Sequence, residues 1–377
     1  MDKENLIGIV LPVNQYNHLS KPGPKLKAIL SFYEKAARMN DLSICYFRFK
    51  DLKSTKEPFM AYVKRENSYV LWEVAKPWVI YKRTGHRSSI NPLIESLMNE
   101  GIRVFNSYRN NNKYKIYKMV RDNEELNKHQ PETKIASPRT INEMMSQFNS
   151  LMIKPDNGEV GRGIMKLEKM QGDIWCLYEK SKERKKGLWK QTFFEDELPT
   201  TLLTKIKNRR YLVQQTIDLA TFSGNPFDMR VSTQRNHLGE WQVSAIIVKV
   251  ATDGQFLTNV GQGGTTTTIE YILADHPVFN LEKVKMDICD LALKLANHIS
   301  LYKKDMADFG FDIGLSKDGI PYLIEVNHVS DYGTLALKNG KLIANEWKDV
   351  FTTPINYARF LLAEVKRVEE KGRSDDS

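Results

Sequence analysis

The sequence predicts an α/β domain followed by a larger α+β region. Apolar runs alternate with helical patterns up to about residue 106, a polar segment follows near residue 110, and strand patterns then dominate around one long helix. Alternating β and α patterns indicate a largely parallel sheet, whereas consecutive strands indicate antiparallel pairing. A length of 377 residues suits two or three domains or lobes.

In the first part of the chain, short apolar runs are expected to form strands, and amphipathic stretches between them helices. The expected strands are Leu6 to Leu11, Ser43 to Phe47, Trp78 to Tyr81 and Ile102 to Phe105, and the helices lie near Lys25 to Arg38 and Leu93 to Glu100. The polar run that starts at Asn110 marks a boundary. Residues 1–110 are therefore predicted to form an N-terminal α/β domain.

The second part begins with a predicted helix from about Lys113 to Glu125. Strands are expected at Leu151 to Lys154, Gly163 to Leu167, Ile174 to Tyr178, Tyr211 to Gln215, Met229 to Arg235, Trp241 to Val250 and in a hairpin near residue 318. Helices are expected from Leu281 to Tyr302 and from Asn345 to Lys371. We expect one domain over 111–366, divided into lobes near 215–225, and a flexible tail over 367–377.

Composition indicates a soluble intracellular protein. Hydrophobic residues make up 41% of the chain, and no apolar run approaches the length of about 20 residues that a membrane helix needs. The first ten residues do not resemble a signal peptide, so a cytoplasmic location is expected. Cys45, Cys176 and Cys289 lie far apart without a C-x-x-C spacing, which predicts reduced, structural thiols.

The net charge of +10 is compatible with nucleic acid, with membrane headgroups or with a site for a polyanionic nucleotide. Much of the excess lies in two basic runs, Lys180 to Lys186 and Lys205 to Arg210. Such runs are more often solvated faces, and few aromatic residues interleave with them. This pattern disfavours a nucleic-acid partner. The sequence does not specify an oligomeric state, and a homodimer is compatible with it.

Near the C-terminus, Asp318-Gly319 separates two alternating apolar runs, which predicts a hairpin with a two-residue turn. Counting outward from that turn pairs Lys317 with Ile320, Gly314 with Leu323, Ile313 with Ile324 and Asp312 with Glu325. Asn327 then shares the face of Asp312 and Glu325. The opposite face is expected to be apolar and to consist of Phe311, Ile313, Leu315, Tyr322, Ile324 and Val326.

The polar face of this hairpin is a candidate metal site. Opposed carboxylates repel one another, so Asp312 and Glu325 require a cation between them. Two carboxylates and the amide oxygen of Asn327 are hard ligands that suit Mg²⁺, with Mn²⁺ as an alternative, and Mg²⁺ commonly binds substrate phosphates as well. The competing interpretation is an ordinary solvated face.

Lys154 ends a predicted strand and is followed by a glycine loop and a second strand. The loop contains Asn157, Gly158, Gly161 and Gly163. Backbone N–H groups of such a loop can bind phosphates, and Lys154 can supply a point charge. The strand-loop-strand order excludes a P-loop and a dinucleotide-binding fingerprint, which lead into helices. An ordinary hairpin remains the alternative.

The segment Gln214-Gln215-Thr-Ile217 carries a strand into a predicted crossing between lobes. Backbone groups there can bind adenine, with Val213 and Ile217 around the ring, although a plain core strand fits equally. Asp228 and Arg230 share one face of the next strand, and Arg230 can hold a γ-phosphate. Lys249 on an otherwise apolar strand requires an anionic partner.

Two further groups of residues are candidate ligand contacts. Asn259 lies in a second glycine cluster that suits close backbone approach to a ligand. Arg83, His86 and Arg87 of the first domain can bind an anionic substrate, although an ordinary exposed loop explains them as well.

These residues, in their order along the chain, resemble the ATP-grasp superfamily from about residue 110 to 365. The closing Asp312…Glu325-x-Asn327 pattern is similar to that of ATP-grasp carboxylate ligases, and the spacings around Asn112-Lys113 and Gln214 to Leu219 resemble the YheC/YheD endospore coat-associated group. The resemblance implies two α+β lobes clamping ATP, preceded by the α/β domain, which helps to form the acceptor site. It also implies association with spores.

Carried over to this sequence, the resemblance implies roles for individual residues. Lys113 and Lys154 would contact phosphates, and Gln214, Gln215 and Ile217 would lie near the adenine or ribose. Arg230, Lys249 and Asn259 would face the triphosphate and an acyl phosphate as the catalytic set. Asp312, Glu325 and Asn327 would bind two Mg²⁺.

The expected function is therefore ATP-dependent ligation of a carboxylate to an amine, with small molecules or peptides as substrates. The carboxylate would attack the γ-phosphate of ATP and give an acyl phosphate and ADP, and two Mg²⁺ with Arg230 and Lys249 would offset the charge that develops in this transfer. His328 or Asp331 can act as a base towards the amine. Two alternatives are a small-molecule kinase on the same fold and a nucleotide-binding spore protein without turnover.

Overall fold

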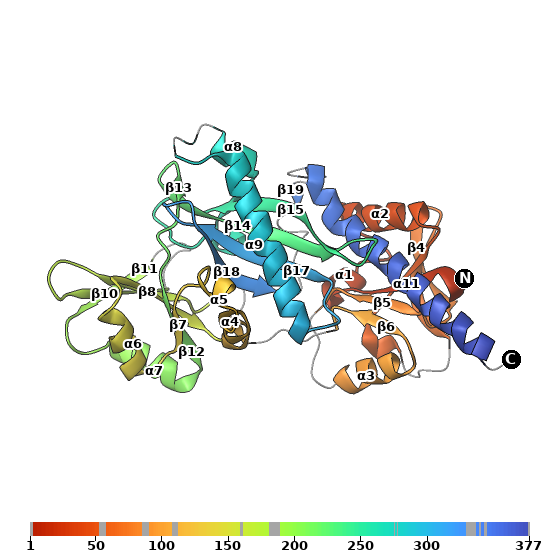
Figure 1. Ribbon diagram of the computed structural model, residues 1–377, viewed down its shortest axis with the longest axis horizontal. Helices are drawn as coiled ribbons and strands as arrows, with labels where there is room; N and C mark the ends of the chain where they lie inside the picture. The colour runs from red at the N-terminus through yellow and green to blue at the C-terminus, as the bar shows by residue number, and fades with distance from the viewer. Residues whose placement is uncertain are drawn as a thin grey trace.

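Three β-sheets follow one another along the chain in the computed structural model. The model describes residues 3–52, 58–84, 90–107, 112–158, 161–180, 189–274, 276, 278–328, 337–338, 341–342 and 345–375. The sheets lie in a row, with the N-terminal sheet at one end and the second sheet at the other (Figure 1). The third sheet lies between the other two. Tyr81 of the first sheet donates a hydrogen bond to Asp308 of the third, and Trp189 of the second donates to Gln255, which follows a strand of the third.

The first sheet has the strand order β4-β3-β2-β1-β5-β6. Its strands are β1 Leu6–Val10, β2 Ser43–Phe47, β3 Phe59–Arg65, β4 Ser68–Val74, β5 Val79–Lys82 and β6 Arg103–Phe105, and its helices are α1 Val13–Tyr16, α2 Pro24–Met39 and α3 Asn91–Asn99. The four predicted strands pair in parallel, as expected. The β3–β4 hairpin was not predicted, although its aromatic and β-branched alternation around Glu66-Asn67 is a typical hairpin signal.

The second sheet is antiparallel and has the order β11-β10-β9-β8-β12-β7. It consists of β7 Thr133–Ile135, β8 Ser150–Pro155, β9 Met165–Lys169, β10 Trp175–Lys180, β11 Trp189–Phe194 and β12 Tyr211–Gln215, with α6 Pro138–Met145 and α7 Thr200–Asn208. The single helix expected from Lys113 to Glu125 is divided into α4 Lys113–Arg121 and α5 Glu124–Asn127. Asn123 causes the break, because its side chain caps α5 by accepting from the Leu126 N–H.

The third sheet has the order β16-β15-β14-β17-β18, and β13 pairs with β14. It consists of β13 Thr221–Phe222, β14 Asn225–Arg235, β15 Trp241–Val250, β16 Thr265–Thr267, β17 Asp308–Leu315 and β18 Pro321–Asn327, with α8 Ile269–Leu273 and α9 Leu281–Tyr302. Helix α9 lies across this sheet (Figure 1) and buries Ile288, Leu291 and Leu295 in the same core as Phe311. A two-stranded unit, β19 Leu337–Lys338 with β20 Lys341–Leu342, follows.

The β17–β18 hairpin confirms one predicted pair and corrects three. Asp312 pairs with Glu325, as predicted, but Gly314 pairs with Tyr322 and Ile313 with Leu323. The turn has three residues instead of two, because the Ser316 N–H donates to the Ile320 carbonyl. Of the turn residues only Gly319 has a positive φ, +79°, whereas the predicted two-residue turn requires two.

An irregularity between Asp312 and Ile313 restores the predicted register beyond the turn. Ile324 is the extra residue, and it lines a cavity instead of the core. Tyr322 was also expected on the apolar face but lines a second surface pocket, whereas Leu323 takes the core position. A one-residue slip exchanges the two faces of a strand, so the turn and the bulge together determine which residues reach the site.

The C-terminal helix belongs to the packing of the first sheet. The 3₁₀ helix Asn345–Lys348 leads into α11 Asp349–Asp375, so the backbone is helical over most of the expected flexible tail. Good helix formers such as Glu and Lys in that stretch favour this extension. Trp347 and Phe351 are fully buried in one cluster with Tyr33 of α2. Helices α11 and α2 lie side by side in Figure 1.

We expect Phe351→Ala to destabilise the protein strongly. The ring stacks on Phe32 with centroids 5.5 Å apart and meets Tyr33 edge-on at 6.1 Å. Loss of a buried phenylalanine costs about 3–5 kcal/mol. Urea unfolding followed by circular dichroism measures the change. Val368→Ala on the same helix is the control, because Val368 is 64% exposed; equal effects of the two substitutions would contradict the packing described.

Candidate functional site

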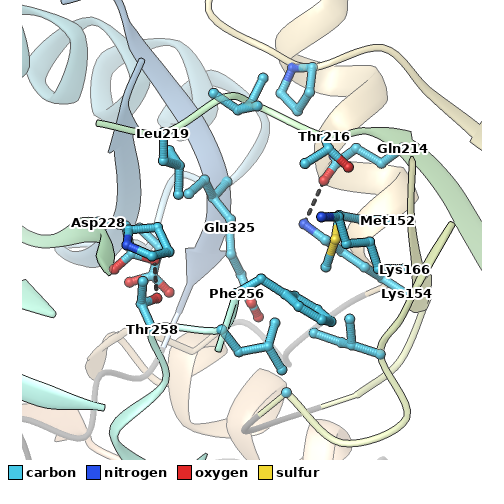
Figure 2. Close-up of a pocket in the computed structure, with 18 of the residues that line it drawn as sticks. Met152, Lys154, Lys166, Gln214, Thr216, Leu219, Asp228, Phe256, Thr258 and Glu325 are labelled. Atoms are coloured by element: carbon cyan, nitrogen blue, oxygen red, sulfur yellow. Dashed lines mark hydrogen bonds between the residues drawn. The ribbon is translucent and has the colours of Figure 1, made fainter. Parts of the chain in front are cut away.

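A cavity of about 430 Å³ lies between the second and third sheets. Lys154 and Met152 of β8 and Lys166 of β9 form one wall, while Asp228 of β14 and Glu325 of β18 form the other (Figure 2). Predicted site residues that line it are Lys113, Lys154, Gly158, Gly161, Gln214, Gln215, Ile217, Lys249, Asn259, Asp312 and Glu325. Elements distant in sequence thus converge on one space.

Four of the predicted residues lie elsewhere. Arg230 and Asn327 stand behind the cavity wall and hydrogen bond to Asp312. A Cβ at Gly163 would lie 3.1 Å from Pro155 Cγ, so this glycine packs under the loop. Asn157 is exposed and is not part of the lining.

Buried charges on three adjacent strands form the rigid wall of the cavity. Strand pairing sets Asp228 opposite Lys249 and Arg230 opposite Asp312. Lys249 Nζ lies 3.0 Å from Asp228 Oδ1 and 2.8 Å from Asp312 Oδ1. Arg230 donates to both oxygens of Asp312, at 2.8 Å from Nε and 3.1 Å from Nη2. Two cations and two carboxylates therefore balance one another.

These contacts set the ionisation of the cluster. Burial disfavours a charged Asp312, but Arg230 and Lys249 outweigh it and hold the pKa of Asp312 well below its usual range. Burial likewise opposes the charge on Lys249, yet Asp228 and Asp312 raise its pKa. For Asp228 burial prevails and raises the pKa. Asp312 is thus the firmly ionised carboxylate of the pair.

A second group of charges lies at the open side of the wall. Lys113 starts α4 and forms an ion pair with Glu325. The start of α4 is tied to the glycine loop, because the Tyr114 N–H donates to Asp156 Oδ1 at 2.9 Å. Lys154 Nζ donates to the neutral amide oxygen of Gln214 at 2.5 Å, and desolvation lowers the pKa of Lys154 to about 8. An anion in the cavity would stabilise the charged form of Lys154.

The two glycine loops meet across the cavity. Gly161 has a φ of +67°, which favours glycine, and a Cβ there would lie 2.9 Å from Asn259 Oδ1. Beside them Trp189 of β11 stacks on Phe256 with centroids 4.2 Å apart and donates to Gln255 Oε1 at 2.8 Å. Phe256 itself lines the cavity (Figure 2). These contacts join the second sheet to residues 255–259 and close one side of the space.

The segment that follows β12 has fewer backbone and side-chain groups available to bind adenine than the sequence predicted. The N–H groups of Gln215 and Thr216 donate to the carbonyls of Glu132 and Ser150. The side chain of Gln214 bridges Lys154 and Thr133 Oγ1. Val213 is fully buried in the core of the second sheet, so its predicted place beside a ring is wrong.

The apolar walls come mostly from residues that the sequence reading missed. They are Met152, Ile164, Leu219, Leu257 and Ile324, beside the predicted Ile217. Met152 and Ile164 flank the glycine loop, and their places next to this loop could have identified them as cavity residues. Ile324 could not be found, because its orientation depends on the bulge in β18. An apolar slot beside buried cations suits a flat ring with an anionic chain.

Two of the remaining candidates, Arg83 and His328, lie near the junction of the first and third sheets. Arg83 is buried at the end of β5, with its guanidinium 5.5 Å from the Tyr33 ring. His328 is buried, and desolvation with nearby Lys303 and Lys82 lowers its pKa to about 3, which is too low for an effective base at neutral pH. His86, Arg87 and Asp331 lie outside the described residues.

Asp312, Glu325 and Asn327 offer the hard ligands that Mg²⁺ prefers, but both carboxylates already bind cationic side chains. Two donors bind each oxygen of Asp312, since Asn327 Nδ2 lies 3.2 Å from Oδ2. A carboxylate offers about four acceptor positions, so Asp312 is saturated. Lys113 pairs with one oxygen of Glu325, Oε1. The residue types therefore suit Mg²⁺, but the amino groups of Lys249 and Lys113 would have to move away from the two carboxylates before the metal could bind.

Other expectations concern thiols, membranes and metal clusters. Cys45, Cys176 and Cys289 are free, and burial raises the pKa of each thiol. No helix within the described ranges is long and apolar enough to cross a membrane. Among those same residues, no group of three or more His, Cys, Asp and Glu side chains could hold a metal ion. A metal here would therefore also need ligands of another kind, such as the amide of Asn327 or a phosphate.

Asp312→Asn should destabilise the protein at neutral pH, because it leaves Arg230 and Lys249 buried without their carboxylate. Breaking such a pair costs about 3–5 kcal/mol. The pKa of Asp312 is lower in the folded state than in the unfolded state, where it is about 4. Its contribution to stability is therefore fully present above about pH 4 and is lost as the pH falls further. The gap between variant and wild type in urea unfolding should thus narrow from pH 5 to pH 2. Asp173→Asn, at a 98% exposed carboxylate, is the control; a constant gap would contradict the assignment.

The sequence is similar to a family model and to two curated proteins. A family model described as YheC/D like ATP-grasp matches residues 101–361. The endospore coat-associated protein YheD of Bacillus subtilis (strain 168) is 26% identical over 277 residues, covering 70% of this chain and 59% of that protein. YheC of the same organism is 22% identical over 346 residues, covering 88% and 92%. The chain thus spans less than two thirds of YheD and most of YheC.

Solved structures show the same fold at low sequence identity. D-alanyl-alanine synthetase A from Vibrio cholerae has a TM-score of 0.52 at 14% identity, with 97% of this chain and 99% of that chain covered. The ATP-grasp ligase PsnB complexed with the precursor peptide PsnA2 and AMPPNP has a TM-score of 0.51 at 13% identity, with 96% and 99% covered. The predicted α/β and α+β class with an ATP-grasp fold is confirmed. With its family model matched over most of its length, the chain belongs to the YheC/D-like ATP-grasp family.

Proposed function

We propose that the protein is an ATP-dependent carboxylate–amine ligase. The observation that carries the proposal is the pairing of two unlike walls around one cavity. One wall has the glycine loop and Lys154, and the other has the Arg230–Asp312–Lys249 cluster with Glu325. Apolar residues between them suit the adenine ring, and the cations suit a triphosphate. The ligases among the fold neighbours support the reaction class.

In the proposed first step, an oxygen of the substrate carboxylate attacks the γ-phosphorus of ATP. The bond from that phosphorus to the β-bridging oxygen breaks, and ADP leaves. Arg230, Lys249 and Lys154 would offset the charge on the transferred group, and Asn259 would position it. Magnesium bound by Asp312, Glu325 and Asn327 would supply further neutralisation of the phosphates.

In the proposed second step, the amine nitrogen attacks the carbonyl carbon of the acyl phosphate. The amide bond forms, phosphate leaves with the electrons of the C–O bond, and the nitrogen loses a proton. The low pKa and burial of His328 make it an unsuitable acceptor for that proton. The released phosphate or solvent can take the proton instead. Substrates are proposed to be small molecules or peptides, since the PsnB structure contains a precursor peptide.

ADP release measures this function. The full chain with Mg²⁺ and ATP is mixed with pairs of amino acids or short peptides, and products are identified by mass spectrometry. We expect ADP, phosphate and an amide in equal amounts for the correct pair, and a drop of at least about a hundredfold in Asp312→Asn. Asp173→Asn should retain activity, because its carboxylate is 98% exposed and outside the cavity. A stable phosphorylated product would instead identify a kinase, and nucleotide binding without ADP release from any pair would identify a protein without turnover.

The occupied carboxylates lead to a prediction about binding order. Lys249 and Lys113 line the cavity and neutralise Asp312 and Glu325, so a metal ion should bind only after phosphates attract these two amino groups away. Electron paramagnetic resonance of Mn²⁺ should show little binding to the protein alone and clear binding with a non-hydrolysable ATP analogue, relative to the analogue without protein. Glu325→Gln should remove this ternary signal.

Lys249→Met tests whether the amino group of Lys249 is what keeps the metal ion away from Asp312. Because it frees one acceptor position of Asp312, it should increase Mn²⁺ binding in the absence of nucleotide. Wild-type protein that binds Mn²⁺ equally well with and without the analogue would disprove the proposed order.

A further inference from the structure

Strand β4 forms an open edge of the first sheet. It is last in the strand order, and no described strand pairs with its outer side. It has seven residues, Ser68–Val74, whereas β6 at the opposite edge has three. An edge strand of this length presents a row of backbone N–H and C=O groups to another chain.

Two neighbouring side chains of this edge strand are apolar and exposed. Leu71 and Trp72 are each 48% exposed, and Met60 on the adjoining β3 is 50% exposed. Glu73 is the single charged residue of β4, which also lacks proline and lysine. The β3–β4 pairing is regular and has no bulge. Three of the devices that usually prevent edge-to-edge association, proline, lysine and a β-bulge, are therefore missing from this strand.

The hairpin register shows which backbone groups point outward. Arg65 pairs with Ser68 around a two-residue turn, so these two residues exchange hydrogen bonds. Along the strand the hydrogen-bonding direction alternates, so the backbone N–H and C=O groups of Ser68, Val70, Trp72 and Val74 point to β3. The N–H and C=O groups of Tyr69, Leu71 and Glu73 point away from the sheet.

We propose that a second copy of this chain pairs with β4 in antiparallel orientation, about a two-fold axis at Leu71. In this register Leu71 faces Leu71 of the second copy, Tyr69 faces its Glu73, and Val70 faces its Trp72. Every outward backbone group of the three residues then has a partner. The two six-stranded sheets become one continuous sheet, and the closed symmetry prevents further growth.

Charge supports the same register. Lys64 of β3 is the cross-strand partner of Tyr69. Glu73 of the second copy would lie in this row, two strand spacings from Lys64, which is about 10 Å between backbones and within reach of two long side chains. Glu73 does not face another carboxylate in this register. Because the pairing is symmetric, the attraction between Lys64 and Glu73 occurs twice.

Cross-linking of the full chain tests the pairing directly. In a Cys289→Ala background, Leu71→Cys should give a covalent dimer with a short bismaleimide, because the two thiols face each other across the axis. Cys45 and Cys176 are buried and should not react. Met60→Cys is the matched control, since it is equally exposed but lies one strand away from the edge.

Light scattering after size-exclusion chromatography measures the dimer itself. The wild type should elute as a dimer at micromolar concentration, and Leu71→Lys should increase its dissociation constant at least tenfold. Its circular dichroism should stay unchanged, because Leu71 is half exposed. A monomeric wild type would overturn the proposal, as would a dimer that Leu71→Lys leaves intact or that Leu71→Cys does not cross-link.

Discussion

The charge cluster shared by β14, β15 and β17 is the constraint on which the site depends. Asp312 accepts from Arg230, Lys249 and Asn327, and each of these donors comes from a different strand. Buried charges are costly unless paired, so the strands cannot slide without exposing an uncompensated ion. The cluster therefore fixes the register of the third sheet and aims its polar groups at one cavity.

The second sheet contributes the adaptable half of the site. Its glycine loop and β10–β11 hairpin reach the third sheet through contacts at Asn259, Gln255 and Phe256. Aromatic stacking and side-chain hydrogen bonds of this kind are individually weak compared with buried ion pairs. One wall is thus held firmly by strand pairing, while the other is attached by a few contacts that can separate and re-form around a ligand.

Much of this arrangement was predictable because local sequence patterns coincide with chemistry. The alternation of apolar and polar residues on β17 and β18 predicted that Asp312 lies opposite Glu325. Lys249, on an otherwise apolar strand, predicted a buried anionic partner. The intermediate pairs were wrong for a physical reason: a three-residue turn and a bulge each shift the register by one residue, and the shifts cancel. Ile324 in the cavity and the bridging of Gln214 to Lys154 depend on contacts between distant segments, which a single sequence does not encode locally.

The position of α11 has a consequence for the order in which the protein forms during synthesis. Strands β1 to β6 are made first, yet Trp347 and Phe351, which complete their core, are made after both other sheets. Chains generally fold from the N-terminus as they emerge from the ribosome. Helix α2 covers part of this apolar face early, but the rest stays exposed until α11 is made, so completion of the earliest sheet is a late step that depends on nearly the whole polypeptide.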